Sequence, residues 1–203
     1  MRLQSFKKLA SVIVLLVAAC APQPKLNPLS SDATILAFGD SITYGTGADD
    51  SSTYPKVLEQ LTGRRVINAG IPGEVTAQGL ARLPAELGEV KPALMILCLG
   101  GNDMIRKLGE QQAAENLRQM IRISREQGVE VVLIGVPRPG VFLNAADFYK
   151  QIADEMAVVY ESDALKKILS DNSLKSDYIH PNAKGYRELA EAIAELLKKR
   201  GAL

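Results

Sequence analysis

The chain has 203 residues, of which 47% are hydrophobic and 23% are charged, and its formal net charge is +1. This composition is typical of a globular protein with enough length for one domain and one substantial core. No basic excess points to a nucleic-acid partner, and no acidic run points to disorder. We therefore expect no nucleic-acid binding.

The first residues have the layout of an export signal. Basic residues precede an apolar run at 9–19, which is too short to span a bilayer as a stable helix. The run ends in VAAC at 17–20, which resembles a bacterial lipobox, the signal in which the cysteine is lipidated and becomes the new first residue. We expect residues 1–19 to be a lipoprotein-type signal peptide and Cys20 to carry the lipid. The alternative is an ordinary secretory signal, with this cysteine incidental.

The next segment is rich in proline and predicts a tether over 20–32, followed by one folded domain over 33–203. A lipidated Cys20 would hold this domain at a membrane surface without a spanning helix. By analogy with lipoprotein sorting, Ala21 after the cysteine favours the outer membrane, facing the periplasm. The oligomeric state stays open.

From residue 33 onward, short apolar runs alternate with amphipathic helical patterns. Strands are predicted over 34–38, 65–68, 94–99, 129–134 and 157–160, and helices near 53–62, 75–88, 111–127, 145–156 and after the capping residue Asn182. Continuous apolar strands separated by helices indicate a parallel sheet covered on both faces. The predicted fold class is α/β, a three-layer α/β/α sandwich with a five-stranded parallel sheet of the flavodoxin-like kind.

Cysteine and histidine are scarce. Lipidation of Cys20 leaves Cys98 without a partner, so no disulfide is expected, and Cys98 lies in the apolar run 94–99 as a buried small hydrophobe. His180 is the only histidine. One histidine and scattered carboxylates give no ligand spacing, so a metal site is not expected.

The sequence around His180 suggests more than a structural histidine. Asp177 lies three residues earlier, and Pro181 prevents a helix from continuing into His180. In such a turn the carboxylate can reach the imidazole, fix its tautomer and stabilise the imidazolium. The pair is a candidate base and orienting group for a hydrolase.

Three predicted strands end in glycine and polar residues, which is common in ordinary turns. Ser41 follows the first strand, Gly73 the second and Asn102 the third. A 2-1-3 strand order would place a hydroxyl, a backbone N–H and a side-chain amide on one rim. Acyl transfer needs that set, one nucleophile and donors aimed at a developing oxyanion. Asp40 and Asp103 are expected to brace this rim through backbone N–H groups rather than act in catalysis.

These motifs together resemble the SGNH (GDSL-type) hydrolases over about residues 33–200. The four blocks occur in order as GDSI at 39–42, NxGxxG at 68–73, GGND at 100–103 and DxxHP at 177–181. The segment GLARLP at 79–84 resembles the bacterial periplasmic thioesterase, lysophospholipase and arylesterase branch of that family.

The resemblance implies a role for each matching residue. Ser41 would be the nucleophile, His180 the base and Asp177 its orienting partner, with an oxyanion hole formed by the N–H groups of Ser41 and Gly73 and the Asn102 amide. The reaction would need no cofactor. Three residues depart from the pattern, namely Ile42 in place of leucine, Glu74 in place of the aspartate frequent in this branch, and Pro72 before Gly73.

The predicted substrate is a small-molecule acyl ester or lipid. The segment 136–143 leaves the fourth strand with exposed apolar residues, and it is either loop packing or a wall of the acyl pocket. The candidate pocket residues are Met104, Ile105, Val141, Phe142 and Leu143.

Three functions remain as hypotheses. The first is a serine hydrolase for acyl or aryl esters, thioesters or lysophospholipids. The second is a deacetylase of cell-envelope carbohydrate, which the same fold supports in related families. The third is a membrane-tethered binding module that has lost its chemistry.

Overall fold

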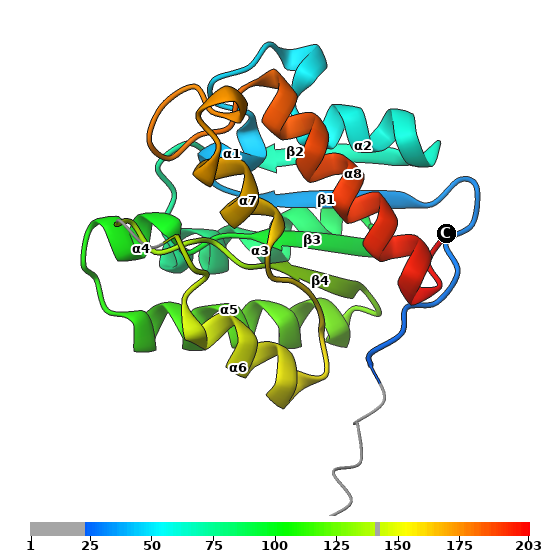
Figure 1. Ribbon diagram of the computed structural model, residues 1–203. Helices are drawn as coiled ribbons and strands as arrows, with labels where there is room; N and C mark the ends of the chain where they lie inside the picture. The colour runs from blue at the N-terminus through cyan, green and yellow to red at the C-terminus, as the bar shows by residue number, and fades with distance from the viewer. Residues whose placement is uncertain (1–22, 141–142) are drawn as a thin grey trace, which may run out of the picture.

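A computed structural model describes residues 23–140 and 143–203 and contains one five-stranded sheet in which every pairing is parallel (Figure 1). The strands are β1 (Thr34–Gly39), β2 (Arg65–Gly70), β3 (Leu94–Cys98), β4 (Glu130–Ile134) and β5 (Val159–Glu161). Their order across the sheet is β2-β1-β3-β4-β5. The predicted 2-1-3 arrangement and the predicted fold class are therefore confirmed.

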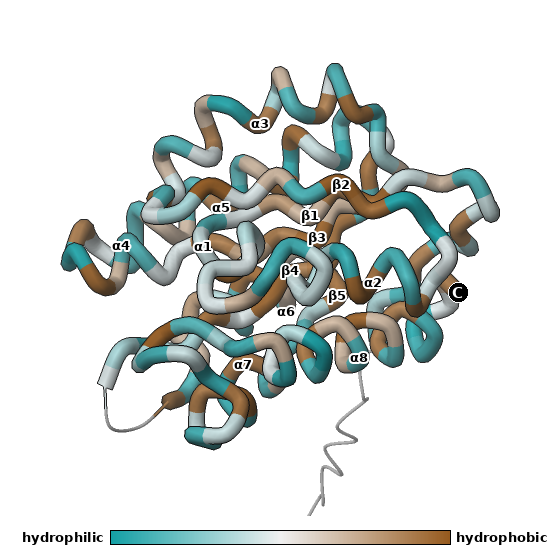
Figure 2. The backbone as a smooth tube through the Cα atoms, turned by 90° about the horizontal axis from the view of Figure 1, so that it is seen from above, coloured by the Kyte–Doolittle hydropathy of each residue, from teal (hydrophilic) through white to brown (hydrophobic). Residues whose placement is uncertain are grey.

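The helices form two layers, one on each face of the sheet. Their bounds are α1 (Ser41–Tyr44), α2 (Tyr54–Thr62), α3 (Thr76–Val90), α4 (Gly101–Ile105), α5 (Glu110–Glu126), α6 (Asp147–Met156), α7 (Ala164–Ser170) and α8 (Ala183–Arg200), with short 3₁₀ turns η1 (Asp50–Ser52) and η2 (Asn172–Leu174). Seen from above, α3 and α5 lie on one side of the strands, and α7 and α8 lie on the other (Figure 2). Helix α2 packs against α8, and α6 packs against α5.

The central strands explain why the sheet needs both layers. Every residue of β3 is buried, and so are all but the first residues of β1 and β4. A strand that is apolar on both faces must be covered on both faces to remove its side chains from water. Cys98 is buried at the end of β3, as predicted.

Some boundaries differ from the sequence prediction. The last strand begins at Val159 rather than at residue 157, because Ala157 takes a left-handed conformation with φ +47° and ends α6. Helix α7 and the short helices α1 and α4 were not predicted, since four to seven residues are too few to show a clear helical period. Asn182 caps α8 as predicted, accepting hydrogen bonds from the N–H groups of Lys184 and Gly185.

Two glycines allow the strand ends to pack closely against the segments that follow them. A Cβ atom on Gly39 would lie 2.1 Å from the Cys98 carbonyl oxygen, and one on Gly70 would lie 2.1 Å from the Tyr44 nitrogen. Backbone atoms that close leave no room for any other side chain. The ends of β1, β2 and β3 are thereby held against one another at the edge where Ser41 begins α1.

Part of the predicted tether is docked on the fold. The Leu26 N–H donates to the Arg200 carbonyl at 2.9 Å, and the Leu29 N–H donates to the Ala202 carbonyl at 2.9 Å. Both leucine side chains are only 8% exposed, and the Asn27 N–H donates to the Glu130 carboxylate. The described residues 23–32 are therefore a packed segment rather than a free linker. The predicted signal peptide and Cys20 lie outside the described residues, and no helix in the described part is long and apolar enough to cross a membrane.

Candidate active site

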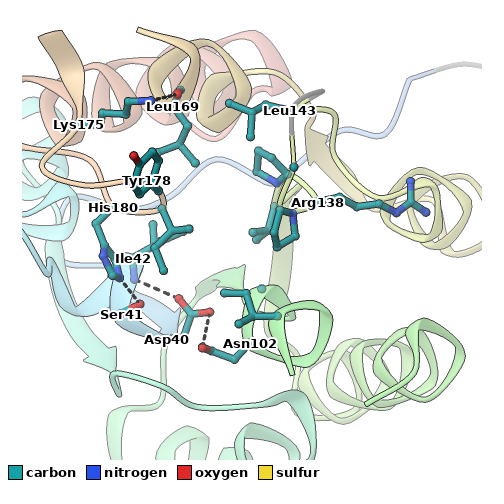
Figure 3. A pocket seen from close by; sticks show the side chains of 17 residues that line it. Asp40, Ser41, Ile42, Asn102, Arg138, Leu143, Leu169, Lys175, Tyr178 and His180 are labelled. Carbon is teal, nitrogen blue, oxygen red and sulfur yellow. Dashed lines mark hydrogen bonds between the residues drawn. The ribbon is translucent and has the colours of Figure 1, made fainter. Parts of the chain in front are cut away.

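The site contains a hydroxyl and an imidazole that lie 139 positions apart in the sequence and are brought together by the fold. Ser41 is the first residue of α1, directly after β1, and His180 lies in the loop between η2 and α8. The His180 Nε2 atom lies 2.9 Å from the Ser41 Oγ atom (Figure 3). This distance is within hydrogen-bonding range for a nucleophile and its general base.

A carboxylate holds the other side of the imidazole. The Asp177 Oδ2 atom lies 2.7 Å from His180 Nδ1, and Asp177 Oδ1 accepts hydrogen bonds from the N–H groups of Ile179 and His180 at 2.8 and 2.9 Å. Burial alone would raise the pKa of Asp177, but these hydrogen bonds together lower it. Asp177 is thus held ionised, as an acceptor for a proton on Nδ1. Ser41, His180 and Asp177 form one hydrogen-bonded series.

Asp40 stands beside this series without joining it. Its Oδ1 atom accepts the Ile42 N–H at 3.0 Å and so caps α1, and its Oδ2 atom accepts from the Asn102 amide at 3.3 Å. Asp103 plays a similar part on the next strand exit, because its carboxylate accepts from the Thr76 N–H at 2.9 Å and from the Thr76 hydroxyl. Both aspartates brace the rim through backbone N–H groups, as predicted.

The buried position of Asp40 has a consequence for stability. Burial raises the pKa of Asp40 to about 7, although the hydrogen bond from the Ile42 N–H opposes the shift. An unfolded aspartate titrates near pH 4, so between about pH 4 and pH 7 the folded protein binds the extra proton. Stability is therefore lost as the pH rises through this window, because the folded state must then hold a buried charge.

We predict that Asp40→Asn removes this pH dependence. From pH 5 to pH 8 the variant should lose about 1–3 kcal/mol less unfolding free energy than the parent chain. Urea unfolding at the two pH values measures the difference. Equal pH dependence in both proteins would show that Asp40 titrates as an ordinary aspartate.

The two other predicted oxyanion donors lie next to each other. The Asn102 side chain, on α4, donates to the Glu74 carbonyl at 3.0 Å as well as to Asp40. Gly73 lies in the turn after β2, has φ +78°, and its carbonyl accepts from Arg106 Nη2 at 2.7 Å. Asn102 lines the same cavity as Ser41, whereas Gly73 is not among the residues that line it.

A cavity of about 380 Å³ opens from Ser41 and His180. Apolar side chains form most of it, and its lining residues are Asp40, Ser41, Ile42, Gly101, Asn102, Ile105, Val136, Pro137, Arg138, Pro139, Gly140, Leu143, Leu169, Lys175, Tyr178, Ile179 and His180. Figure 3 shows Leu169 and Leu143 at one end and Ser41 at the other. Such a concave, mainly apolar space with few polar groups is typical of a small-molecule site.

The predicted pocket residues differ in where they lie relative to this cavity. Ile105 and Leu143 line it, whereas Met104 does not, because its side chain is partly buried against the hydrophobic core. Val141 and Phe142 lie outside the described residues. In the segment that follows β4, residues 136–140 and 143 thus form a wall of the cavity.

Sequence reasoning missed several lining residues. Tyr178 and Ile179 stand between Asp177 and His180, so the spacing of that motif could have identified them. Leu169 belongs to the unpredicted α7. Arg138 belongs to the segment 136–143 that was expected to be loop packing or a pocket wall; its guanidinium forms an ion pair with Glu110 at 2.8 Å and connects this wall to α5.

A serine, an imidazole and a carboxylate hydrogen-bonded in series at the carboxyl edge of a parallel sheet form the arrangement used by serine hydrolases. The comparisons with known proteins agree with this class. Residues 37–188 match the GDSL-like lipase/acylhydrolase family. The chain belongs to this family and is an enzyme that hydrolyses ester bonds.

The chain is also similar to individual members of this family in sequence and in structure. Esterase TesA of Pseudomonas aeruginosa is 38% identical over 130 residues, which cover 62% of this chain and 65% of that protein. The thioesterase 1/protease 1/lysophospholipase L1 of Escherichia coli is 31% identical over 173 residues, or 81% of this chain and 83% of that protein. A crystal structure of TesA superposes with a TM-score of 0.74 at 31% identity, covering 82% of this chain and 98% of that one.

Proposed function

We propose that the chain hydrolyses carboxylic esters or thioesters of the acyl, aryl or lysophospholipid type, with Ser41 as nucleophile, His180 as base and Asp177 as orienting partner. The observation that carries the proposal is the series of short contacts, 2.9 Å from Ser41 Oγ to His180 Nε2 and 2.7 Å from Nδ1 to Asp177. The similarity to esterase TesA supports the same reaction class.

The proposed reaction has two steps. His180 Nε2 takes the proton of the Ser41 hydroxyl as Oγ attacks the acyl carbonyl, and the imidazolium then gives that proton to the departing alcohol or thiol. The acyl-enzyme is hydrolysed when a water molecule, deprotonated by the same nitrogen, attacks it and Ser41 recovers its proton. Asp177 keeps the other nitrogen protonated throughout and stabilises the imidazolium.

The oxyanion formed in each step needs hydrogen-bond donors. We assign this role to the N–H groups of Ser41 and Gly73 and to the Asn102 amide. The Asn102 amide already points at the cavity edge beside Asp40, and its second contact is the Glu74 carbonyl. Each donor of this kind contributes about 10²–10³ in turnover in other acyl-transfer enzymes.

The lining of the cavity favours an acyl chain over an acetylated sugar. Ile105, Leu143 and Leu169 present hydrocarbon to the space beyond Ser41, and a glycan would leave its hydroxyls without partners there. Each buried methylene contributes about 0.8 kcal/mol of binding free energy, so an acyl chain that fills the cavity should bind more tightly than an acetyl group.

We predict that kcat/KM for nitrophenyl esters rises from acetyl to medium-length chains by about 10- to 100-fold and then falls. Leu143→Ala should lengthen the preferred chain, because it enlarges the cavity. Leu108→Ala is the matched control, since Leu108 is exposed and does not line the cavity. Activity confined to acetyl groups, with hydrolysis of an acetylated glycan, would instead identify a deacetylase.

The binding-module hypothesis is tested by the same site. A fluorophosphonate should label the intact protein at Ser41, and absence of labelling together with absence of ester hydrolysis would favour a protein that binds without turnover.

We propose in addition that the chain is exported and anchored by a lipid on Cys20, with the domain on the periplasmic side of the outer membrane. The support is the VAAC sequence at 17–20 and the basic and apolar residues before it. The mass of the N-terminal peptide of the exported protein checks this, since an unmodified Cys20 excludes the anchor.

A further inference from the structure

A buried ion pair lies next to the turn that carries Gly73, and the backbone of one of its members contacts Asn102 of α4. Arg82 of α3 forms a bidentate contact with Glu74, in which Nε lies 2.7 Å from Oε1 and Nη2 lies 2.7 Å from Oε2. The Glu74 side chain is 4% exposed and the Arg82 side chain 18%. Neither residue lines the cavity, so neither can contact a substrate there.

The guanidinium also binds the ends of two strands. Arg82 Nη2 donates to the Ala69 carbonyl of β2 at 2.8 Å and lies 3.5 Å from the carbonyl of Gly39, the last residue of β1. The guanidinium carbon, Cζ, lies 3.9 Å from the centre of the Phe38 ring. Arg82 therefore connects the strand that leads into Ser41 with the strand that leads into Gly73.

The backbone of Glu74 continues this connection to the donors. Its N–H donates to the Ile71 carbonyl at 3.1 Å, which closes the turn containing Gly73, and its carbonyl accepts the Asn102 amide at 3.0 Å. The ion pair of its side chain therefore fixes the position of Glu74, whose carbonyl contacts the Asn102 amide and whose backbone is bonded to Gly73. A displacement of Glu74 would move Gly73 and release Asn102.

We propose that Glu74 and Arg82 are positioning residues that pre-organise the Gly73 N–H and the Asn102 amide for the oxyanion. This inference rests on the proposed function. Donors are effective when they are held in place before charge develops, because they then need no reorganisation during the reaction. A buried ion pair is weak evidence for a stabilising role, since desolvation offsets most of the attraction, whereas its geometry imposes one arrangement on the groups it joins.

The contacts of the pair use the full length of the glutamate side chain at position 74. Both carboxylate oxygens face guanidinium nitrogens, and a fork-to-fork contact sets the angle as well as the distance. Lysine at 82 would supply one charge without the second contact. Glutamine at 74 would turn an NH₂ group toward the guanidinium and break one of the two hydrogen bonds.

The experiment compares Glu74→Gln with Glu86→Gln. Glu86 is the second carboxylate on Arg82, at 3.2 Å from Nη1, but it lies on α3, and its hydrogen bond to Arg82 involves neither Gly73 nor Asn102. We expect Glu74→Gln to lower kcat by about 10- to 100-fold with KM changed less than about threefold, and Glu86→Gln to leave both within about twofold.

A second measurement separates positioning from folding. An alkyl boronic acid forms a tetrahedral adduct with a serine hydroxyl and places an oxygen where the oxyanion would lie. Its affinity should fall in parallel with kcat in Glu74→Gln, while the affinity of a fatty alcohol of the same length, which places no anionic oxygen at the donors, should change less than about threefold. Because removing one member of a buried pair destabilises a fold, the double variant with Glu74→Gln and Arg82→Met serves as the second variant, with the same expected losses; the carboxylate that it leaves without a partner is the partly exposed Glu86.

The outcomes distinguish failure of the positioning inference from failure of the proposed function. Unchanged kcat and boronate affinity in either folded variant would reduce the pair to a structural role and overturn the inference, leaving the proposed function intact. No ester hydrolysis and no boronate binding in the parent chain would overturn the proposed function itself.

Discussion

Replacing Ser41 by alanine is expected to lower kcat for ester hydrolysis by about 10⁴- to 10⁶-fold while the fold is retained. In the proposed reaction the Ser41 hydroxyl attacks the acyl carbonyl while His180 Nε2, 2.9 Å away, takes its proton. Ser41 is the first residue of α1, and alanine is compatible with helical backbone there. The measurement is turnover of a nitrophenyl ester together with fluorophosphonate labelling, which should disappear.

A matched control for this variant is Ser170→Ala. Ser170 ends α7, is exposed, and bonds only locally to the Lys166 carbonyl. Its loss should change kcat less than about twofold. Persistent labelling of Ser41→Ala would remove Ser41 from the mechanism and direct attention to another nucleophile.

Asp177→Asn is expected to lower kcat by about 10²- to 10⁴-fold. Asparagine can still accept the N–H groups of Ile179 and His180 through its Oδ1 atom, so the turn should keep its shape. Its NH₂ group, however, would replace the acceptor that faces His180 Nδ1 at 2.7 Å. The imidazole would then present its proton on Nε2, where the base must be free to accept one from Ser41.

The neighbouring Asp171 supplies the comparison. It lies in the same connection between α7 and α8, accepts the Ser173 N–H at 2.8 Å, and does not contact the imidazole. Asp171→Asn should leave kcat within about threefold. If Asp177→Asn retained activity to the same extent, the orienting role would be excluded, and the buried carboxylate of Asp40 would be the next candidate.

The parallel sheet was predictable because it depends on patterns that are local in the sequence. Strands β1, β3 and β4 are continuous apolar runs, and helix-length amphipathic segments separate them, which requires a doubly covered parallel sheet. The contact between residues 41 and 180, 139 positions apart, could be anticipated only because four short motifs were considered together.

What escaped prediction depends on three-dimensional packing. The Glu74–Arg82 pair joins a loop to the second turn of α3, and nothing in their spacing distinguishes a buried pair from two solvated side chains. Met104 packs against the hydrophobic core while its neighbour Ile105 lines the cavity, because consecutive residues of a helix point in different directions. The attachment of residues 23–32 was obscured by their prolines, because proline is compatible with an extended segment whether that segment is docked or free.

That attachment determines how the enzyme would stand on a lipid surface. With an acyl chain on Cys20, only Ala21 and Pro22 separate the bilayer from Gln23, so the end of the domain that carries the strand starts and the C-terminus must face the headgroups (Figure 1). The six residues of β1 then raise Ser41 by about 20 Å. Esters embedded in the anchoring leaflet would be out of reach, and the substrates would arrive by diffusion from the aqueous side or from an opposing membrane.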